Sequence, residues 1–520
     1  MTEPGDIFSA AFRRFPAAAW RQAALIPGPM TGDSPFLEGT CRSLLPGAID
    51  ATARFLDAAG IRAGDRVAWL GWNDPMQLVL LAACARIGAV QVPLNWRLTT
   101  DELRWIEADA GFRVLCTPNG RRRPAPRFEH PYVADFLARR GREPGCRVSD
   151  PLDEVGVHRT AAMAAPPTAD AAAPLLLCYT SGTSGRPKGA VLTQGSVAAN
   201  ARNATAIFGL APADTVLTVL PMFHAGGLNI QTVPALLAGA CVILHTRFYP
   251  DAFFNAVAEW RPTLSLLVPT VMQALIRHPR WDAADLSCFR AIGAGSSPVP
   301  PELILAFHAK GVPIQQVYGA TETGPIAIAQ TRAEALAAPG SIGRPAPEAA
   351  ARIVGPDGTP LAAGETGQIE VRGPALMQGY RGAPPLGEAW FATGDAGRAD
   401  ADGRFWFTDR LTAVIISGGE NVYPAEVERV LLQAPGVLEA AVCGRPDPRW
   451  GEVPVAVVVA APGFDRAAVL DHCAGRIARF KQPRDLLVVD ALPRTALGKV
   501  KLAELRALVA PSAAPSAAAG

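Results

Sequence analysis

The chain has 520 residues, which is too many for a single hydrophobic core, so about two to four domains are expected. Its 49 basic and 47 acidic residues leave a net charge of +2, which excludes a global field that would direct the protein to nucleic acid or to an anionic membrane. The nine cysteines include no C-x-x-C pair, so neither a zinc site nor a disulfide framework is expected, and a reducing compartment is indicated.

The sequence carries neither an export signal nor an apolar segment long enough for a membrane. The opening stretch, "MTEPGDIFSAAFRRF", lacks a basic region followed by an apolar one. The longest apolar run, Leu78 to Ala85, is cut by Arg86 and is too short to cross a bilayer. We therefore expect a cytoplasmic protein without an integral membrane segment.

Helices and strands alternate over the first part of the chain. Apolar spacing predicts a helix over 48–62, a buried strand over 65–71, a second helix over 74–88 and a second strand over 89–95. Apolar runs predict further strands over 215–222, 240–245 and 264–270. This alternation is typical of an α/β fold with parallel sheets covered by helices.

The texture of the sequence changes twice toward the C-terminus. Short strands and Gly-rich turns between about 340 and 409 predict a small barrel-like β subdomain. Residues 410–508 predict a compact α+β domain, and the composition of 509–520 predicts a disordered tail. The expected organisation is an N-terminal domain of residues 1–409, which includes the β subdomain, and a C-terminal domain of residues 410–508.

The stretch "TSGTSGRPKG" at 180–189 combines hydroxyls, glycines and one lysine. Its glycines allow backbone N–H groups to turn toward an anion, and Lys188 adds a positive charge that a phosphate can share. The stretch is not a Walker A loop, because Pro187 precedes the lysine and Gly189 follows it. Taken alone, it fits an ordinary Ser/Gly-rich turn as well as a phosphate-binding loop.

Four further motifs decide between these two interpretations. "YGATETG" at 318–324 provides Glu322, a carboxylate suited to Mg²⁺, which prefers oxygen ligands. "WFATGDAG" at 390–397 places Asp395 directly after a glycine, where it can accept hydrogen bonds from ribose hydroxyls. "TDRLTAVIISGGENVYPAEVE" at 408–428 and "LPRTALGKV" at 492–500 complete the set.

With these motifs in this order, the chain resembles the adenylate-forming superfamily of acyl-CoA synthetases, luciferases and peptide-synthetase adenylation domains, over about residues 50–505. The resemblance implies a large N-terminal domain of parallel-type sheets and helices with a small barrel-like β subdomain, followed by a small, mobile α+β lid. It also implies an ATP-dependent ligase. The enzyme would activate a fatty or aromatic carboxylic acid as acyl-AMP, release pyrophosphate, and pass the acyl group to the thiol of CoA.

The resemblance also assigns roles to individual residues. The ATP-binding residues it implies are Thr180, Ser181, Gly182, Thr183, Ser184, Gly185, Lys188, Gly293, Ala294, Gly295, Ser296, Tyr318, Gly319, Ala320, Thr321, Asp395 and Arg410. Among these, Thr180 would join Glu322 at the Mg²⁺ ion, and Glu322 would count among the catalytic residues. Lys499 matches the catalytic lysine of the family. Chemistry requires such a cation, because an acyl carboxylate and the α-phosphate of ATP repel each other as they meet.

The remaining implied residues concern the acid, the thiol and the hinge. His224 in "LPMFHAGGL" would gate the acyl site or orient the carboxylate of the acid. The acyl pocket would be bounded by His224, Gly227, Val268, Met272, Gly295, Gly319 and Thr323, which are mostly small or apolar. Ser417, Gly418 and Gly419 would line the path of the CoA thiol. The hinge position is Thr412, where family members commonly carry a charged residue, and this departure puts the thioesterification rate in question.

Alternatives to the CoA ligase stay open at this point. "ARFKQP" at 478–483 resembles the acyl-CoA ligase form of the lid and favours CoA over a carrier protein. A stand-alone enzyme that loads a carrier protein in trans would use the same first half-reaction. A luciferase-like oxygenase would need substrate features that the sequence does not reveal, and a non-catalytic nucleotide-binding protein would lack Lys499 or Glu322. The expected partners are a carboxylic acid, ATP and CoA; no nucleic acid is expected, and a homodimer stays open.

Overall fold

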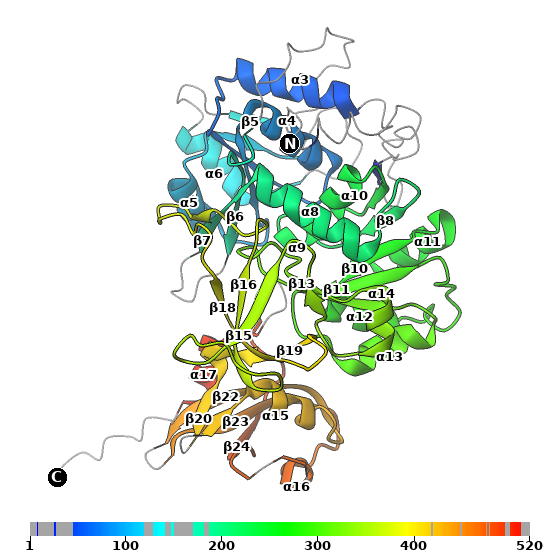
Figure 1. Cartoon of the computed structure of the whole chain (residues 1–520), viewed down its shortest axis with the longest axis vertical. Coiled ribbons are helices and arrows are strands. Elements are labelled where there is room, and N and C mark those ends of the chain that lie inside the picture. Colours follow the sequence, from blue (N-terminus) through cyan, green and yellow to red (C-terminus); the bar gives the residue numbers. More distant parts are fainter. Residues whose placement is uncertain are drawn as a thin grey trace, which may run out of the picture. The chain divides into compact units, whose positions relative to one another are not determined.

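Two helix-covered sheets form the first half of the protein in the computed structural model (Figure 1). The structure describes residues 8, 25–27, 45–118, 128–140, 147–149, 170–180, 187–417, 420–447, 450–474, 476–477, 479–494 and 500–510. The chain divides into two compact units, residues 1–351 with 371–391 and residues 352–370 with 392–520. The predicted boundary between the N-terminal and C-terminal domains, at Arg410, lies inside the second unit. The expectation that residues 410–508 move as a lid stays a prediction.

The larger sheet of the first unit has eight strands, in the order β1-β9-β8-β10-β11-β12-β13-β14. These strands span Leu25–Pro27, Cys241–Leu244, Thr215–Thr218, Leu264–Leu267, Ala291–Gly295, Ile314–Tyr318, Ile328–Ala329 and Arg344–Pro345. The strands from β1 to β12 pair in parallel, and β13 and β14 are antiparallel additions. The predicted strands over 215–222 and 264–270 end earlier, at Thr218 and Leu267.

The second sheet of this unit has seven strands, in the order β17-β7-β6-β3-β2-β4-β5. They span Gly379–Tyr380, Lys188–Thr193, Pro174–Thr180, Val90–Leu94, Arg66–Leu70, Val114–Cys116 and Arg147–Ser149. The strands from β6 to β5 are parallel, whereas β7 runs antiparallel to β6 and β17 antiparallel to β7. Every residue of β3 is buried, as expected for a parallel strand covered on both faces.

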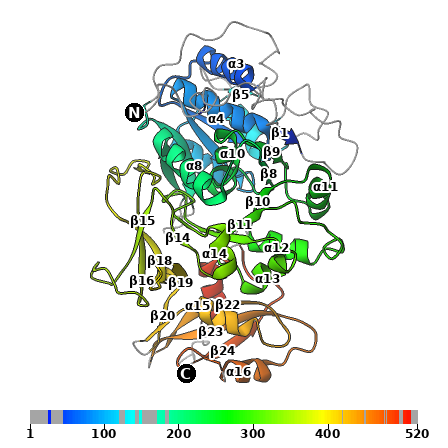
Figure 2. The ribbon, with the colours of Figure 1, turned by 45° about the vertical axis from the view of Figure 1, so that its right-hand side comes forward.

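Helices cover both sheets. They are α3 (Leu45–Ala58), α4 (Pro75–Ile87), α5 (Thr100–Ala110), α6 (Pro131–Arg140), α8 (Gln194–Phe208), α9 (Ala225–Asn229), α10 (Thr232–Leu237), α11 (Pro250–Trp260), α12 (Pro269–Ile276), α13 (Pro301–Ala309) and α14 (Arg332–Ala337). Helix α8 packs against α10, and α12 against α13 (Figure 2). The bounds of α4 follow from its ends: Asp74 accepts a hydrogen bond from the Met76 amide, and Gly88 closes the helix with φ +72°.

The second unit is built mainly from antiparallel strands. One four-stranded sheet has the order β15-β16-β18-β19, with bounds Ala350–Val354, Thr366–Arg372, Phe391–Ala399 and Phe405–Arg410. A second sheet has the order β21-β20-β23-β22, with bounds Glu420–Val422, Ile415–Ser417, Gly451–Ala460 and Val437–Asp447, and β24 (Asp485–Val488) pairs in parallel with β23. Helices α15 (Pro424–Leu431), α16 (Arg466–Ala474) and α17 (Leu502–Val509) accompany it.

This architecture confirms the predicted α/β fold class, with parallel sheets and helices ahead of smaller β-rich and α+β parts. Separate apolar clusters form the cores of the two units. One large cluster joins both sheets of the first unit, and two smaller clusters lie on opposite faces of the sheet that contains β22 and β23. Among the described residues, no helix combines the length and the apolar character needed to span a membrane.

Candidate active site

The site begins where β6 ends and β7 starts. Thr180 is the last residue of β6 and pairs with Lys188, the first residue of β7. The predicted phosphate-loop residues between them, Ser181, Gly182, Thr183, Ser184 and Gly185, lie outside the described residues. The two flanks of the loop are therefore fixed in register by an antiparallel ladder, which holds the Thr180 hydroxyl and the Lys188 amine near the same end of the strands.

Glu322 receives two hydroxyl donors at one carboxylate oxygen. The Thr180 hydroxyl and the Tyr380 hydroxyl each donate a hydrogen bond to Glu322 Oε1, both at 2.9 Å. The backbone amide of Met377 donates to the Glu322 carbonyl at 2.8 Å, which ties the same segment to the chain before Tyr380. The structure thus brings together Thr180 and Glu322, the two residues predicted at the magnesium ion.

The oxygen atoms of this pair suit Mg²⁺. A carboxylate and a hydroxyl lie within hydrogen-bonding distance of each other, and Mg²⁺ commonly takes one or two protein carboxylates while phosphate and water oxygens complete its shell. Within the described ranges, no group of three or more His, Cys, Asp or Glu side chains is arranged to hold a metal. The residues present therefore fit a Mg²⁺ ion that is shared with a bound nucleotide, not a cage made by protein alone.

Tyr380 is the residue of this cluster that the sequence did not single out. It lies in the two-residue strand β17, and its hydroxyl is held by a carboxylate 58 positions earlier in the chain. Burial, together with the neighbouring Glu322 charge, raises the pKa of Tyr380, so its hydroxyl stays a donor at neutral pH. A "GY" dipeptide in a Gly-rich stretch gives no local sign of this partnership.

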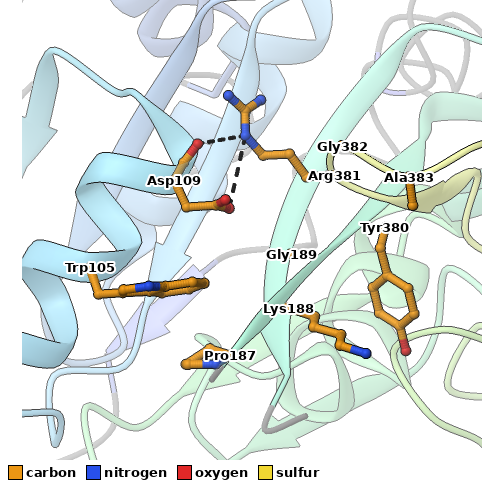
Figure 3. Close-up of a pocket in the computed structure, with 9 residues that line it drawn as sticks. All are labelled: Trp105, Asp109, Pro187, Lys188, Gly189, Tyr380, Arg381, Gly382 and Ala383. Carbon is orange, nitrogen blue, oxygen red and sulfur yellow. Dashed lines mark hydrogen bonds and ion pairs between the residues drawn. The ribbon is translucent and has the colours of Figure 1, made fainter. Parts of the chain in front are cut away.

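A pocket of about 330 Å³ lies beside this cluster, in the first unit (Figure 3). Its lining includes Trp105 of α5, Lys188 of β7 and Tyr380 of β17. The Lys188 amine points at the Tyr380 ring, 5.4 Å from the ring centroid, whereas Arg381 Nε donates to the Asp109 carbonyl at 2.6 Å. Arg381 is thus engaged by α5, whereas the Lys188 amine lies over the ring of Tyr380, whose hydroxyl donates to Glu322.

The segments predicted to flank adenine come from adjacent parallel strands. β11 ends in Gly293, Ala294 and Gly295, which pair with 315–317 of β12. Ser296 follows with φ +68°, and the hydroxyl of Thr323 accepts a hydrogen bond from the Ala320 amide at 2.8 Å. The structure therefore places Gly293–Ser296 beside the strand that leads into Tyr318–Thr323, the stretch that also holds Gly319, Ala320 and Thr321.

Gly295 tolerates no side chain in this arrangement, and Gly295→Ala gives a first test. A Cβ atom there would lie 2.3 Å from the Val317 carbonyl oxygen, so β11 and β12 would have to move apart. We expect the free energy of unfolding to fall by about 1–3 kcal/mol, measured by thermal or denaturant unfolding. Gly47→Ala in α3, where nothing lies within 4 Å of the added carbon, is the matched control and should not destabilise. Equal stability of the two variants would contradict the tight packing at Gly295.

Three of the predicted acyl-site residues, Val268, Gly295 and Gly319, lie at or just after the ends of the neighbouring parallel strands β10, β11 and β12. His224 precedes α9, and its ring centroid lies 4.4 Å from that of Phe223. A Cβ on Gly226 would lie 3.3 Å from Ser296 Oγ, so the start of α9 lies against the end of β11. The Pro221 carbonyl lies against Gly227. Val268 directly precedes α12, and Met272 lies within that helix and is fully buried. Thr323 is also buried.

In the second unit, Asp395 and Arg410 are paired across neighbouring strands. They are register partners in β18 and β19, and Arg410 Nε lies 2.8 Å from Asp395 Oδ1. The Asp395 side chain is 9% exposed and that of Arg410 58%. The carboxylate is therefore the buried member of the pair, and the Arg410 guanidinium is the part that reaches the surface of the sheet.

Asp409, next to this pair, holds the start of α15. Its Oδ2 accepts a hydrogen bond from the Ala425 amide, and its Oδ1 accepts one from the Arg410 amide, both at 2.7 Å. Burial raises the pKa of the Asp409 carboxyl. A carboxylate at the first turn of a helix also interacts favourably with the helix dipole.

The other predicted residues of this unit are only partly described. Ser417 ends β20 and is buried, whereas Gly418, Gly419 and Lys499 lie outside the described residues. The backbone of Thr412 lies in a short 3-10 helix, η1 (Leu411–Ala413). On either side of Lys499, Arg494 and Val500 form an isolated antiparallel bridge.

Glu428 of α15 gives a pH-dependent prediction for this unit. The residue as a whole is partly exposed, but its carboxyl group is desolvated, and this raises the pKa of the carboxyl from the ordinary 4.5 to about 7. One carboxyl oxygen accepts a hydrogen bond from the Val442 amide at 2.8 Å. The folded state therefore holds this proton between pH 4.5 and about 7, where the unfolded state has lost it, so stability falls as pH rises through that range.

We therefore expect Glu428→Gln to stabilise the unit that contains α15 by about 1–3 kcal/mol at pH 8 and to have little effect at pH 4. The glutamine carbonyl can still accept the Val442 amide. Calorimetric unfolding at both pH values measures the difference. Glu439→Gln, which alters an exposed ion pair with Arg494, is the control and should change stability little at either pH. The same gain at both pH values would contradict the raised pKa of Glu428.

Comparison with known proteins assigns the family. The model of the AMP-binding enzyme family matches residues 45–381, and that of the AMP-binding enzyme C-terminal domain matches residues 426–499. An indoleacetate–CoA ligase of Aromatoleum aromaticum is 45% identical over 90% of this chain and 92% of its own length. A feruloyl-CoA synthase of an Amycolatopsis species is 43% identical over 87% of this chain and 91% of its own length.

Solved structures agree with the sequence relatives. ATP-bound MatB from Rhodopseudomonas palustris superposes with a TM-score of 0.84 at 29% identity, over 97% of this chain and 99% of that one. The o-succinylbenzoate CoA synthetase MenE from Bacillus subtilis, in complex with its acyl-adenylate, has a TM-score of 0.83 at 30% identity, over the same shares of the two chains.

The chain belongs to the AMP-binding enzyme family. Within that family it is an ATP-dependent acyl-CoA ligase of the AMP-forming type, an enzyme that joins a carboxylic acid to the thiol of CoA. This confirms the predicted class, enzyme type, and ATP and CoA as substrates.

Proposed function

We propose that this ligase activates an aromatic carboxylic acid, with Glu322 and Thr180 holding Mg²⁺, and that the reaction takes place in the cytoplasm, where ATP and CoA are both supplied. The identity to ligases of indoleacetate and ferulate, 45% and 43%, carries the proposal, because the long-chain fatty-acid ligase FadD13 of Mycobacterium tuberculosis is only 33% identical. A long-chain fatty acid is therefore the second candidate. A homodimer remains a prediction.

Small residues at the start of α9 let this helix pack closely against the segments next to the proposed acyl site. Ala225, Gly226 and Gly227 carry almost no side chain, and Gly226 lies against Ser296 at the end of β11. A side chain at Gly227 would meet the Pro221 carbonyl, so the glycines are needed for this packing. In this proposal, His224 at the start of α9 orients the carboxylate of the acid toward the nucleotide.

The residues of the first unit would bind and orient the phosphates. Lys188 provides a positive charge next to the loop, and the hydroxyls of Thr180 and Tyr380 fix the orientation of the Glu322 carboxylate. When bound there, Mg²⁺ would neutralise charge on the pyrophosphate leaving group. Asp395 would accept hydrogen bonds from the ribose hydroxyls, with Arg410 holding its carboxylate in place.

Lys499 would act where the acid meets the nucleotide. The acyl carboxylate and the α-phosphate are both anionic, and a lysine between them lowers the cost of their approach. After pyrophosphate leaves, Ser417, Gly418 and Gly419 would line the path by which the CoA thiol reaches the acyl carbon. The uncharged hinge residue Thr412 can still absorb the backbone rotation, since a hinge requires no particular side chain.

A pyrophosphate-release assay across a panel of acids, with and without CoA, tests the proposal. Turnover with aryl acids that requires CoA supports it. Turnover with long-chain acids alone would select the fatty-acid alternative. Acyl-AMP that accumulates although CoA is present would contradict transfer to CoA and would favour a carrier protein as the acceptor.

A further inference from the structure

Gln231 is a buried polar side chain at the edge of the acyl site. It lies between α9 and α10, and only 2% of the residue is exposed. Neither its amide oxygen nor its amide nitrogen makes a hydrogen bond within the described part of the chain. Buried amides are almost always satisfied, because leaving one unpaired is costly, so a Gln in this state indicates a partner that the protein itself does not supply.

The Gln231 side chain lines a small cavity between these helices and the larger sheet. The cavity has a volume of about 10 Å³, and its wall includes Gly227 of α9, Thr218 of β8, Thr232 of α10 and Leu266 of β10. This volume accommodates one water-sized group and no ring. Because Gly227 also belongs to the proposed acyl pocket, the cavity adjoins the place where the acid would lie.

The two threonines in the wall have already used their protons. Thr232 Oγ1 donates to the Gly227 carbonyl at 2.7 Å, so in the 2.8 Å contact between the two hydroxyls Thr218 must be the donor. Each hydroxyl can then only accept a further hydrogen bond. Gln231 is thus the group in this wall with both donor and acceptor capacity to spare.

We infer that Gln231 is a specificity-determining residue of the acyl site, whose amide hydrogen bonds to one polar atom on the far edge of the aromatic acid. The inference rests on the proposed function and narrows it to aryl acids with a ring N–H or a ring hydroxyl. The ring stays outside the cavity, in the acyl pocket of the proposed function, and either its hydroxyl group enters the cavity or its N–H bond points into it. An aryl acid without that atom leaves the Gln231 amide unpaired and is discriminated against.

Matched acid pairs test this inference on the full chain. Indole-3-acetic acid is compared with 1-benzothiophene-3-acetic acid, and 4-hydroxycinnamic acid with cinnamic acid, so that each pair shares its ring outline and differs in the polar group. The readout is kcat/KM for pyrophosphate release. In at least one pair, we expect the wild-type enzyme to favour the polar member by about tenfold or more. Gln231→Leu, which keeps the size and removes both polar atoms, should bring that ratio to within about threefold of unity.

Thr52→Val is the matched control. Thr52 is another fully buried residue whose hydroxyl has no hydrogen-bond partner in the described chain, and it lies in α3, so its replacement should leave the ratio at the wild-type value. Gln231→Met serves as a second variant if the leucine form does not fold. The absence of a preference in the wild-type enzyme already overturns the inference, without any variant.

The outcomes separate this inference from the function on which it rests. Absence of pyrophosphate release with every acid in the panel overturns the proposed function and the inference together. Release without preference for the polar member in either pair overturns the inference alone. A preference that survives in Gln231→Leu also overturns the inference. A lower melting temperature of that variant would then indicate that Gln231 holds a structural water.

Discussion

Lys499→Ala is expected to slow acyl-adenylate formation by at least about 10²–10³-fold, the typical loss when one preorganised electrostatic group is removed at a site of charge development. The reason is specific to the first half-reaction, where two anions are brought together. Thioester formation from acyl-adenylate no longer faces that repulsion and should be largely spared. Pyrophosphate release measures the first step, and CoA-dependent consumption of synthetic acyl-adenylate measures the second.

Lys501→Ala is the natural control for this experiment. Lys501 lies two residues further along and donates to Glu504 Oε1 at 2.7 Å in an exposed ion pair, so its loss should leave both half-reactions close to the wild-type rates. Equal losses in the two half-reactions for Lys499→Ala would contradict its assignment to the adenylation step.

Glu322→Gln is expected to lower the adenylation rate by about 10²–10³-fold and to raise the Mg²⁺ concentration needed for half-maximal rate. The glutamine oxygen can still accept the hydroxyls of Thr180 and Tyr380, so the substitution removes the negative charge and keeps the hydrogen-bond geometry. A titration of the pyrophosphate-release rate with Mg²⁺ separates a weaker metal site from a general loss of folding.

Two further variants sharpen the result. Tyr380→Phe removes one hydrogen bond to Glu322 and keeps its charge, so we expect a loss of less than about tenfold. Glu348→Gln changes a carboxylate of the same unit that pairs with Arg202, away from Thr180 and Lys188, and should behave as wild type. An unchanged Mg²⁺ dependence in Glu322→Gln would show that this carboxylate does not hold the metal.

Local patterns in the sequence predicted the fold well where a single element carries the signal. The helix over 74–88 is marked by Asp74 and Pro75 at one end and Gly88 at the other, and the structure has α4 between these residues. The buried strands were equally visible as short apolar runs. Strand ends were less visible: the apolar run over 215–222 continues past the end of β8 at Thr218, because Val219, Leu220 and Met222 in the connection are also buried.

The sequence indicates candidate site residues where one motif contains them, and gives no sign of contacts formed between two distant segments. Glu322 was found through "YGATETG", but Tyr380 was not, because its partnership with Glu322 exists only after β17 has paired with β7. Gln231 was missed for a related reason. Its unpaired amide is a property of the folded wall around it, and "LNIQT" by itself resembles any polar break between two helices.

The hydrogen bond that Asp409 accepts from the Ala425 amide bears on the hinge motion proposed at Thr412. A pivot at Thr412 has Asp409 before it and Ala425 after it, so a large rotation there pulls the Asp409 carboxylate away from the Ala425 amide that it accepts in this conformation. The bond therefore stabilises the conformation described here and contributes nothing to the rotated one. If the proposed hinge at Thr412 is correct, its side chain has no charge with which to offset that bias, and the balance between the two orientations would depend on whether the Ala425 amide finds another acceptor in the second one.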